Sequence, residues 1–120
     1  MPKYVDAFLI AIPKDRIEEY RKVARKAGKI WKEHGALEYR ECIGDDLDIA
    51  GLPGPSFPKR IRLKENETVV FSWILYKSKA HRDRVNKKVM SDPRLAMDVK
   101  QMPFDAKRMS YGGFEVLVDA

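Results

Sequence analysis

The sequence predicts an α+β fold of the ferredoxin-like type, β-α-β-β-α-β, with a four-stranded antiparallel sheet and its helices on one face. Four segments rich in β-branched and aromatic residues alternate with two segments whose apolar residues recur at helical spacing. Two of the strands are apolar on both faces, although the helices can cover only one face of the sheet. We therefore expect a homodimer in which a second copy covers the other face.

The first two elements are a strand over residues 4–12, stopped by Pro13, and a helix over residues 14–34. Steps of three and four residues place one apolar stripe on this helix, formed by Ile17, Tyr20, Ala24, Ala27, Trp31 and His34. Basic residues lie on the opposite side, namely Lys22, Arg25, Lys26 and Lys29. Asp15 favours the helix start and Gly35 its end.

A second strand over residues 36–43 is followed by a long connection over residues 44–66. The connection begins with an acidic stretch over residues 45–48 and has a centre rich in proline and glycine over residues 51–58. A loop of this length in a small domain is typically functional or a contact arm. We expect it to reach a partner, not to link two domains.

The second half of the chain repeats the alternation. A third strand covers residues 68–76, and Ser78 is a good N-cap for a helix that runs to about Met90. Asp92 and Pro93 favour a short further helix. The last strand is expected over residues 107–118, with a bulge or close backbone approach at Gly112 and Gly113.

Composition limits the classes of protein that need consideration. The 120 residues fit one domain, and the longest apolar run is too short to span a membrane. A single cysteine excludes an intrachain disulfide, and we expect no metal and no cofactor. The N-terminus lacks the pattern of a signal peptide, so a cytoplasmic location is expected.

The net charge of +6 is concentrated in the two helices. Residues 14–34 hold eight basic and four acidic residues, and residues 77–88 hold six basic and one acidic. Such stretches are typically solvated helix faces, and the alternative is an anionic partner such as nucleic acid. No aromatic side chains are interleaved with the basic ones on the exposed helix faces, which weakens the case for single-stranded nucleic acid.

Three stretches carry a resemblance to a known family: residues 31–42 (WKEHGALEYREC), residues 67–78 (ETVVFSWILYKS) and residues 102–109 (MPFDAKRM), followed by GGFE at 112–115. Together they resemble the YbaA-like bacterial family of unknown function. The resemblance implies a dimeric α/β barrel, in which two ferredoxin-like subunits pack their sheets face to face. It also implies a pocket between helices and sheet, as in related cofactor-independent monooxygenases and isomerases. The family has no established catalytic residues to carry over.

The topology brings the end of the first helix and the start of the second to the same end of the sheet. His34, Glu38, Tyr76 and His81 are therefore candidates for one pocket mouth, where two histidines, a carboxylate and a phenol could exchange protons. The full set of ligand-binding candidates is Trp31, His34, Glu38, Arg40, Tyr76, His81 and Arg108. Arg108 is expected on the last strand, where it could hold a carboxylate.

Each of these residues also has a structural interpretation. The two histidines and the two tryptophans are typical packing residues, and Glu38 with Arg40 is more typical of an ion pair across the sheet. Cys42 is expected to be buried and inert. Asp6, in an otherwise apolar position, needs a basic partner, expected on a neighbouring strand.

Two functions follow. The first is a homodimeric protein that binds a small organic acid or aromatic, with or without cofactor-independent catalysis. The second is a non-catalytic module that binds RNA or another anion through its basic helix faces. A third interpretation is an interaction scaffold that uses residues 44–66 as its contact arm.

Overall fold

The computed structural model describes residues 1–95 and 102–120 and confirms the α+β, ferredoxin-like fold. Its antiparallel sheet has the strand order β2-β3-β1-β4. The strands are β1 (Tyr4–Pro13), β2 (Glu38–Ile43), β3 (Glu67–Tyr76) and β4 (Ser110–Glu115). The helices are α1 (Ile17–Glu33), the short α2 (Phe57–Arg60) and α3 (Lys79–Met90). Single 3-10 turns cover Lys14–Arg16, Pro93–Leu95 and Ala106–Arg108.

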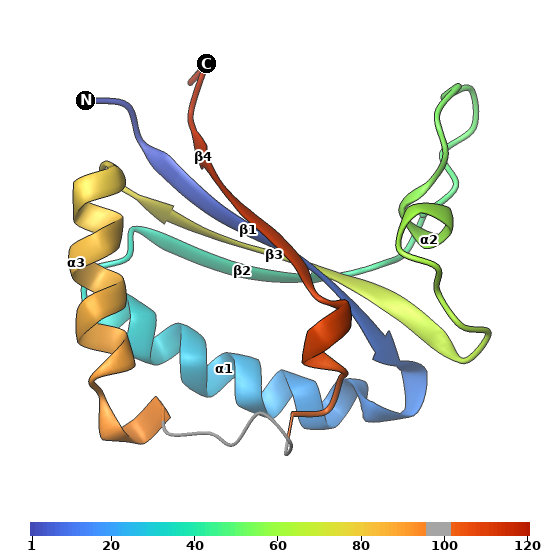
Figure 1. Cartoon of the computed structure of the whole chain (residues 1–120), viewed down its shortest axis with the longest axis horizontal. Helices are drawn as coiled ribbons and strands as arrows, with labels where there is room; N and C mark the ends of the chain where they lie inside the picture. The colour runs from blue at the N-terminus through green and yellow to red at the C-terminus, as the bar shows by residue number, and fades with distance from the viewer. Residues whose placement is uncertain (96–101) are drawn as a thin grey trace.

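The two long helices α1 and α3 lie on the same face of the sheet, as the sequence predicts (Figure 1). The apolar stripe of α1 turns toward the sheet, and Tyr20, Ala24 and Ile30 are buried there. Helix α3 begins as predicted, because the Ser78 hydroxyl accepts a hydrogen bond from the His81 backbone N–H at 3.1 Å. None of the helices in the described ranges is long and apolar enough to cross a lipid bilayer.

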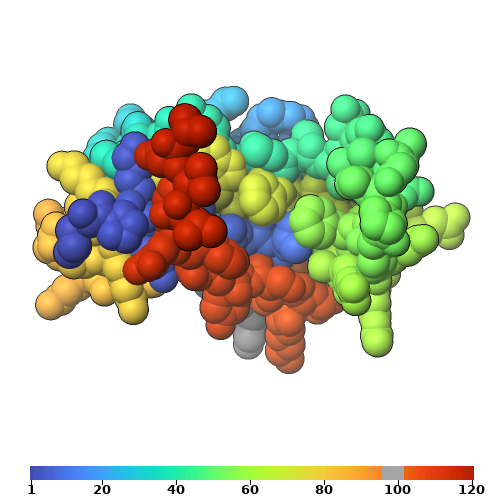
Figure 2. Space-filling model, turned by 90° about the horizontal axis from the view of Figure 1, so that it is seen from above, coloured from blue at the N-terminus to red at the C-terminus, as the bar shows by residue number. Residues whose placement is uncertain are grey.

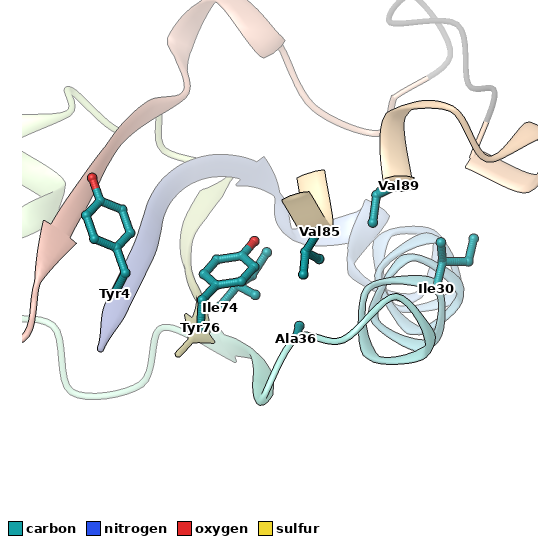
Figure 3. Packing of buried hydrophobic residues seen from close by; sticks show 7 residues of the cluster. All are labelled: Tyr4, Ile30, Ala36, Ile74, Tyr76, Val85 and Val89. Carbon is teal, nitrogen blue, oxygen red and sulfur yellow. The ribbon is translucent and has the colours of Figure 1, made fainter. Parts of the chain in front are cut away.

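The core between helices and sheet has two parts. The first gathers Tyr76 and Ile74 of β3, Ile30 of α1, and Val85 and Val89 of α3 (Figure 3). The second packs Tyr20 and Ala24 of α1 against Ile10, Ile12 and Val70 of the sheet. These side chains fix the helices on the sheet through apolar burial, worth roughly 1.5–3 kcal/mol for each fully buried large side chain.

The opposite face of the sheet is apolar, and neither α1 nor α3 covers it (Figure 1). The strand register places Leu9 beside Phe71 and Val5 beside both Leu75 and Phe114. Phe71 is 38% exposed and Phe114 is 57% exposed. We refer to this surface, formed by residues 5, 7, 9, 71, 73, 75 and 114, as the open face.

Residues 44–66 form an arm that contains α2 and rises on the side of the open face (Figure 1). Seen from above, the arm stands at one end of this side, and the two chain termini stand at the other (Figure 2). Ile49, Leu52 and Phe57 of the arm are about half exposed or more. The arm is therefore part of the same side of the molecule as the open face.

Several local expectations from the sequence are wrong. The last strand begins at Ser110 and ends at Glu115, so Arg108 lies in the 3-10 turn before it and not on the strand. Cys42 is exposed and not buried as predicted. It lies on β2, the outer strand of the sheet, and on the strand face that turns away from the helices. Asp6 finds its basic partner, Arg82, on α3 and not on a neighbouring strand.

Candidate functional site

A cavity of about 410 Å³ lies between α1 and the sheet. Its wall is mostly apolar, with Phe8 and Ile74 from the strands, Ala27 and Trp31 from α1, and Phe104 from the chain before β4. The volume falls in the range of about 300–1,000 Å³ that is typical of small-molecule sites. A site of this kind takes its specificity from the few polar groups that border it.

One carboxyl group, that of Glu41, borders the cavity. The Tyr20 hydroxyl donates to one of its oxygens at 2.8 Å, and the Tyr39 hydroxyl donates to the other at 2.7 Å. Both donors are neutral phenols, and the described residues provide no cation in ion-pair contact with Glu41. Glu41 is thus a half-buried acid with neutral partners. We call it, together with Tyr20, Tyr39 and the adjacent Ser72, the Glu41 cluster.

The surroundings shift the acidity of the whole Glu41 cluster. Burial raises the pKa of Glu41 above its ordinary value of 4.5, against the lowering by hydrogen bonds from Tyr39, Tyr20 and Ser72. Burial and the nearby Glu41 charge raise the pKa of both tyrosines, so they stay protonated near neutral pH. The carboxyl group is therefore the member of this cluster that can exchange a proton.

The sequence builds the cluster by simple alternation. Tyr39 and Glu41 are two residues apart on β2, so both face the helices, and Tyr20 lies on the apolar stripe of α1. Gly28 makes room for Tyr39, because a Cβ atom at Gly28 would lie only 2.7 Å from the Tyr39 ring. The sequence predictions missed this cluster. The available signal was Glu41 itself, a charged residue on a strand face that is otherwise apolar.

A second polar cluster lies between α3 and the sheet. Asp6 of β1 is buried, and its Oδ1 lies 3.6 Å from the Arg82 Nε. Arg82 also lies over the ring of Tyr4, 4.9 Å from its centroid, and donates to the Tyr4 hydroxyl at 3.2 Å. Its buried Nε has no hydrogen-bond partner within the described chain. Burial raises the pKa of Asp6 more than Arg82 lowers it.

Of the seven predicted ligand-binding residues, Trp31 borders the cavity. Its Nε1 donates to the Tyr76 hydroxyl at 3.1 Å and to the Asn86 side-chain oxygen at 3.2 Å. The Tyr76 hydroxyl also lies 3.1 Å from the same Asn86 oxygen. The structure thus joins Trp31 and Tyr76 in one hydrogen-bonded network that leads from the cavity wall toward Asp6.

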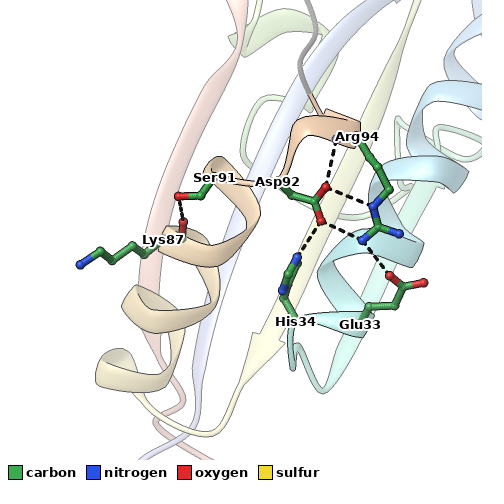
Figure 4. A network of polar contacts seen from close by, with 6 residues as sticks. All are labelled: Glu33, His34, Lys87, Ser91, Asp92 and Arg94. Carbon is green, nitrogen blue, oxygen red and sulfur yellow. Dashed lines mark hydrogen bonds and ion pairs between the residues drawn. The ribbon is translucent and has the colours of Figure 1, made fainter.

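His34 is held in a different network at the end of α1 (Figure 4). Its Nε2 lies 2.8 Å from an Asp92 oxygen, and Arg94 joins the same carboxylate at 2.8 Å. Arg94 also pairs with Glu33 at 2.8 Å. Hydrogen bonds from Arg94 and His34 hold the pKa of Asp92 well below its usual range. These contacts tie the end of α1 to the turn that follows α3.

His81 lies at the same end of the sheet as His34 but has its own partner. Its Nδ1 accepts a hydrogen bond from the Lys77 backbone N–H at 3.0 Å, and its ring centroid is 6.1 Å from that of Tyr76. A Cβ atom at Gly35 would lie 3.4 Å from His81 Nε2. Burial first, and the nearby Lys77 second, lower the pKa of His81, so the ring favours the neutral form.

The other three candidates lie elsewhere. Glu38 and Arg40 share the strand face that turns away from the helices, where the Arg40 guanidinium lies 5.8 Å from the centre of the Trp73 ring. The structure records this cation–π contact in place of the predicted ion pair with Glu38. Arg108 forms a two-pronged ion pair with Glu67, at 2.6 and 2.9 Å, at the opposite end of β3 from Tyr76.

No three metal-ligating side chains come together in residues 1–95 and 102–120. The arrangement that the structure does contain suits acid–base chemistry on a bound molecule. Glu41 borders an apolar cavity, and the two phenols on its oxygens supply neutral hydrogen bonds that can rearrange when a proton moves.

Comparison with known proteins supplies relatives but no activity. The chain is 48% identical to the "Uncharacterized protein YbaA" of Escherichia coli strain K12 over 117 residues, which cover 98% of both chains. It has the same identity and coverage with the protein of that name from Shigella flexneri. A crystal structure described as a dimeric ferredoxin-like protein from an uncultured marine organism matches all of both chains, with a TM-score of 0.61 and 13% identity.

That structural match supports the ferredoxin-like fold and nothing more specific. The family model "Protein of unknown function (DUF1428)" matches residues 3–106. The chain therefore belongs to the DUF1428 family, together with the YbaA proteins.

Proposed function

We propose that this protein is a homodimer that binds a small aromatic molecule or organic acid in the cavity between α1 and the sheet. Glu41 exchanges a proton with the bound molecule, in the manner of a cofactor-independent isomerase or monooxygenase. The observation that carries the proposal is a half-buried carboxyl group with neutral partners on the wall of an apolar cavity. A general acid or base works best when its pKa approaches the working pH, and burial moves Glu41 in that direction.

A second copy of the chain is the expected cover of the open face. Phe71, Trp73 and Leu75 of β3 lie there beside Leu9 of β1, and Phe114 extends the surface to β4. A patch of contiguous large apolar side chains is unusual on a monomer. A two-fold axis through this face would bury the patch against itself and leave both cavities on the outer sides of the dimer.

The location proposed for the dimer is the cytoplasm. The exposed thiol of Cys42 suits a reducing compartment, where a free cysteine on the surface stays a thiol.

Native mass spectrometry of gently purified protein tests the cavity and the dimer together. We expect a mass near twice 13.9 kDa plus that of a retained small molecule. The variant Ala27→Phe should fill the cavity and remain a dimer without the added mass. A wild-type monomer would contradict the dimer. Loss of the added mass in a control such as Lys22→Ala, which borders neither the cavity nor the sheet, would contradict the cavity site.

Binding in solution can be read from one tryptophan. The two tryptophans lie on different surfaces, with Trp31 on the cavity wall and Trp73 on the open face. The small molecule retained in native mass spectrometry can be released from the protein and added back. In a Trp73→Phe protein, its binding should change the fluorescence of Trp31. The change should disappear in Ala27→Phe. An unchanged emission in the presence of saturating ligand would contradict the proposed site.

RNA binding through the basic helix faces is the second candidate. Lys22, Arg25, Lys26 and Lys29 are all exposed, as such contacts require. Binding to phosphates predicts an affinity that falls steeply as salt rises. Affinity for RNA that does not change between about 50 and 200 mM salt would exclude this candidate.

A further inference from the structure

We propose that the groove between α1 and the outer strand β2 is a binding site for a small molecule that carries phosphate groups. The groove has a volume of about 400 Å³. Ala27 and Trp31 of α1 line the cavity, whereas the groove runs along another side of the same helix. The groove and the cavity share Tyr20, Ala24, Tyr39 and Glu41 as a common wall. The basic residues of the groove do not line the cavity, so this inference does not require a ligand in the cavity.

Most of the charge of the groove comes from one side of α1, and Arg40 of β2 adds one further cation to the lining. Four basic residues line it at helical spacing, namely Arg21, Arg25, Lys29 and Lys32. Residues three and four apart lie on the same side of a helix, so these side chains form a row along the groove. Glu41 is the one carboxylate among the lining residues of the described chain, and it faces the two tyrosines.

The two ends of the row are already engaged. Arg21 pairs with Glu18 at 3.1 Å, and the Lys32 ammonium donates to the Leu37 carbonyl at 2.7 Å. Arg25 and Lys29 lie between them, and neither is in an ion pair within the described part of the chain. The middle of the groove therefore offers two cations to an anion from outside.

The strand side of the groove adds a second kind of donor. β2 is the outermost strand, so its backbone pairs with β3 on one side only. In an antiparallel sheet, alternate N–H groups of an outer strand point away from its neighbour. Backbone N–H groups and arginine together are the usual ligands of phosphate oxygens.

The concave shape favours a small molecule over a nucleic acid. A phosphate backbone would also need the cations outside the groove, such as Lys22 on the same helix, whereas a compact phosphate compound would need only Arg25 and Lys29. The two tyrosines of the groove, Tyr20 and Tyr39, have their hydroxyls on Glu41, and their rings are packed under α1. They do not form the exposed stacking platform that single-stranded nucleic acid requires.

Glu41 lies at the boundary between the groove and the cavity and borders both. Its hydrogen-bond partners are the hydroxyls of Tyr20, Tyr39 and Ser72. The nearby charged groups are the basic residues that line the groove and, among the residues that line the cavity, Lys26 and Arg94. A bound anion disfavours the ionised form of a nearby carboxyl. By linkage, the anion should bind more weakly as pH rises and Glu41 ionises.

The test is calorimetric titration with inorganic pyrophosphate at fixed ionic strength, with citrate as a multivalent anion that lacks phosphate. We expect saturable binding of pyrophosphate and weaker binding of citrate. Arg25→Glu with Lys29→Glu should weaken pyrophosphate binding by at least about tenfold, because two attractive contacts become repulsive. Both side chains are exposed, so the fold should persist, which circular dichroism checks.

The matched control is Lys22→Glu with Lys87→Glu, which changes the net charge equally at two exposed positions outside the groove. It should change the affinity by no more than about twofold. Equal weakening by both double variants would show a general charge effect and overturn the proposal, as would citrate binding as tightly as pyrophosphate. In Glu41→Gln the part of the pH dependence that exceeds the ionisation of pyrophosphate itself should disappear, and a pH dependence identical to that of the wild type would overturn the link to Glu41.

Discussion

Two carboxyl groups, the buried Asp6 and the half-buried Glu41, lie on the helix-facing side of the same sheet, and their surroundings differ. Asp6 has a cation, Arg82, from the helix above it. Glu41 has two phenols, from Tyr20 and Tyr39. Burial raises the pKa of both acids above their ordinary values. The charge of Asp6 is balanced inside the fold, whereas that of Glu41 is not.

Under the proposed function, this difference separates an acid that holds the fold together from one that exchanges a proton with a ligand. An ion pair between α3 and β1 holds two elements together and leaves its members engaged. Neutral hydrogen bonds leave the carboxyl group free to change its charge, and Glu41 also has a cavity beside it. A raised pKa alone does not mark a functional residue, because ion pairs in the core have one too.

The largest effect is expected where the Asp6 pair is broken. Arg82→Leu leaves a buried acid without its cation, and such a loss typically costs about 3–5 kcal/mol in the free energy of unfolding. Urea denaturation measures it. Asp6→Asn combined with Arg82→Leu should recover most of the loss, because no unpaired charge remains. A single variant as stable as the wild type would remove the distinction between the two acids.

The next effect concerns the space that Gly28 leaves for Tyr39. Gly28→Ala places a Cβ atom 2.7 Å from the ring, so Tyr39 must move and its hydrogen bond to Glu41 must weaken. The strain of overpacking is about 1–3 kcal/mol, and it opposes the gain of about 1 kcal/mol from alanine in a helix. We expect a net destabilisation in thermal unfolding. The control Gly54→Ala, in open space, should be neutral.

A smaller, pH-dependent effect is expected for Glu41. Its pKa is raised in the folded state, so the folded protein binds more protons above pH 4.5, and the free energy of unfolding falls as pH rises through the raised value. Glu41→Gln should flatten this fall and be relatively more stable at the higher pH. Glu38→Gln, three residues away along β2 and on the other strand face, should leave the slope unchanged. A slope that survives Glu41→Gln would assign it to Asp6.

The smallest effect is expected for His34. Asp92 keeps Arg94 when His34→Gln removes one contact, so the loss should stay below about 1 kcal/mol. The Trp31 fluorescence response in the Trp73→Phe protein should also persist, because His34 does not border the cavity among the described residues. Loss of the response would return His34 to the ligand site that the sequence suggests.

The fold was accessible from the sequence because its signals are local and periodic. The stripe of α1, the Ser78 cap and the two-sided apolar pattern of β1 and β3 each follow from spacing along one segment. Strand ends were less accessible. The last strand starts three residues late because residues 106–108 form a tight turn whose start is held by the Asp105 side chain, which accepts from the Lys107 N–H.

The candidate site was only partly accessible. The sequence grouped Tyr76 with His34, Glu38 and His81, whereas in the structure the hydroxyl of Tyr76 accepts a hydrogen bond from Trp31. The Glu41 cluster depends on contacts across segments, between α1 and β2, and no single spacing reports them. Arg108 was named as a candidate because the predicted strand began a few residues too early. The structure places it in the turn before β4, where it pairs with Glu67.

The two ends of the chain meet at one corner of the sheet (Figure 1). The Val116 N–H donates to the Lys3 carbonyl at 2.9 Å, and Lys3 pairs with Asp119 at 3.2 Å. Adjacent ends permit a circular permutation. A short linker could join residues 120 and 1, and new ends could open in the arm beside Gly54, where the chain has open space. The permuted chain would run from α2 and β3 through α3 and β4 into β1, α1 and β2. The basic residues of the groove, together with Tyr20, Tyr39 and Glu41, would then lie in its last third, whereas Val70 and Ser72 of β3 would lie near its start.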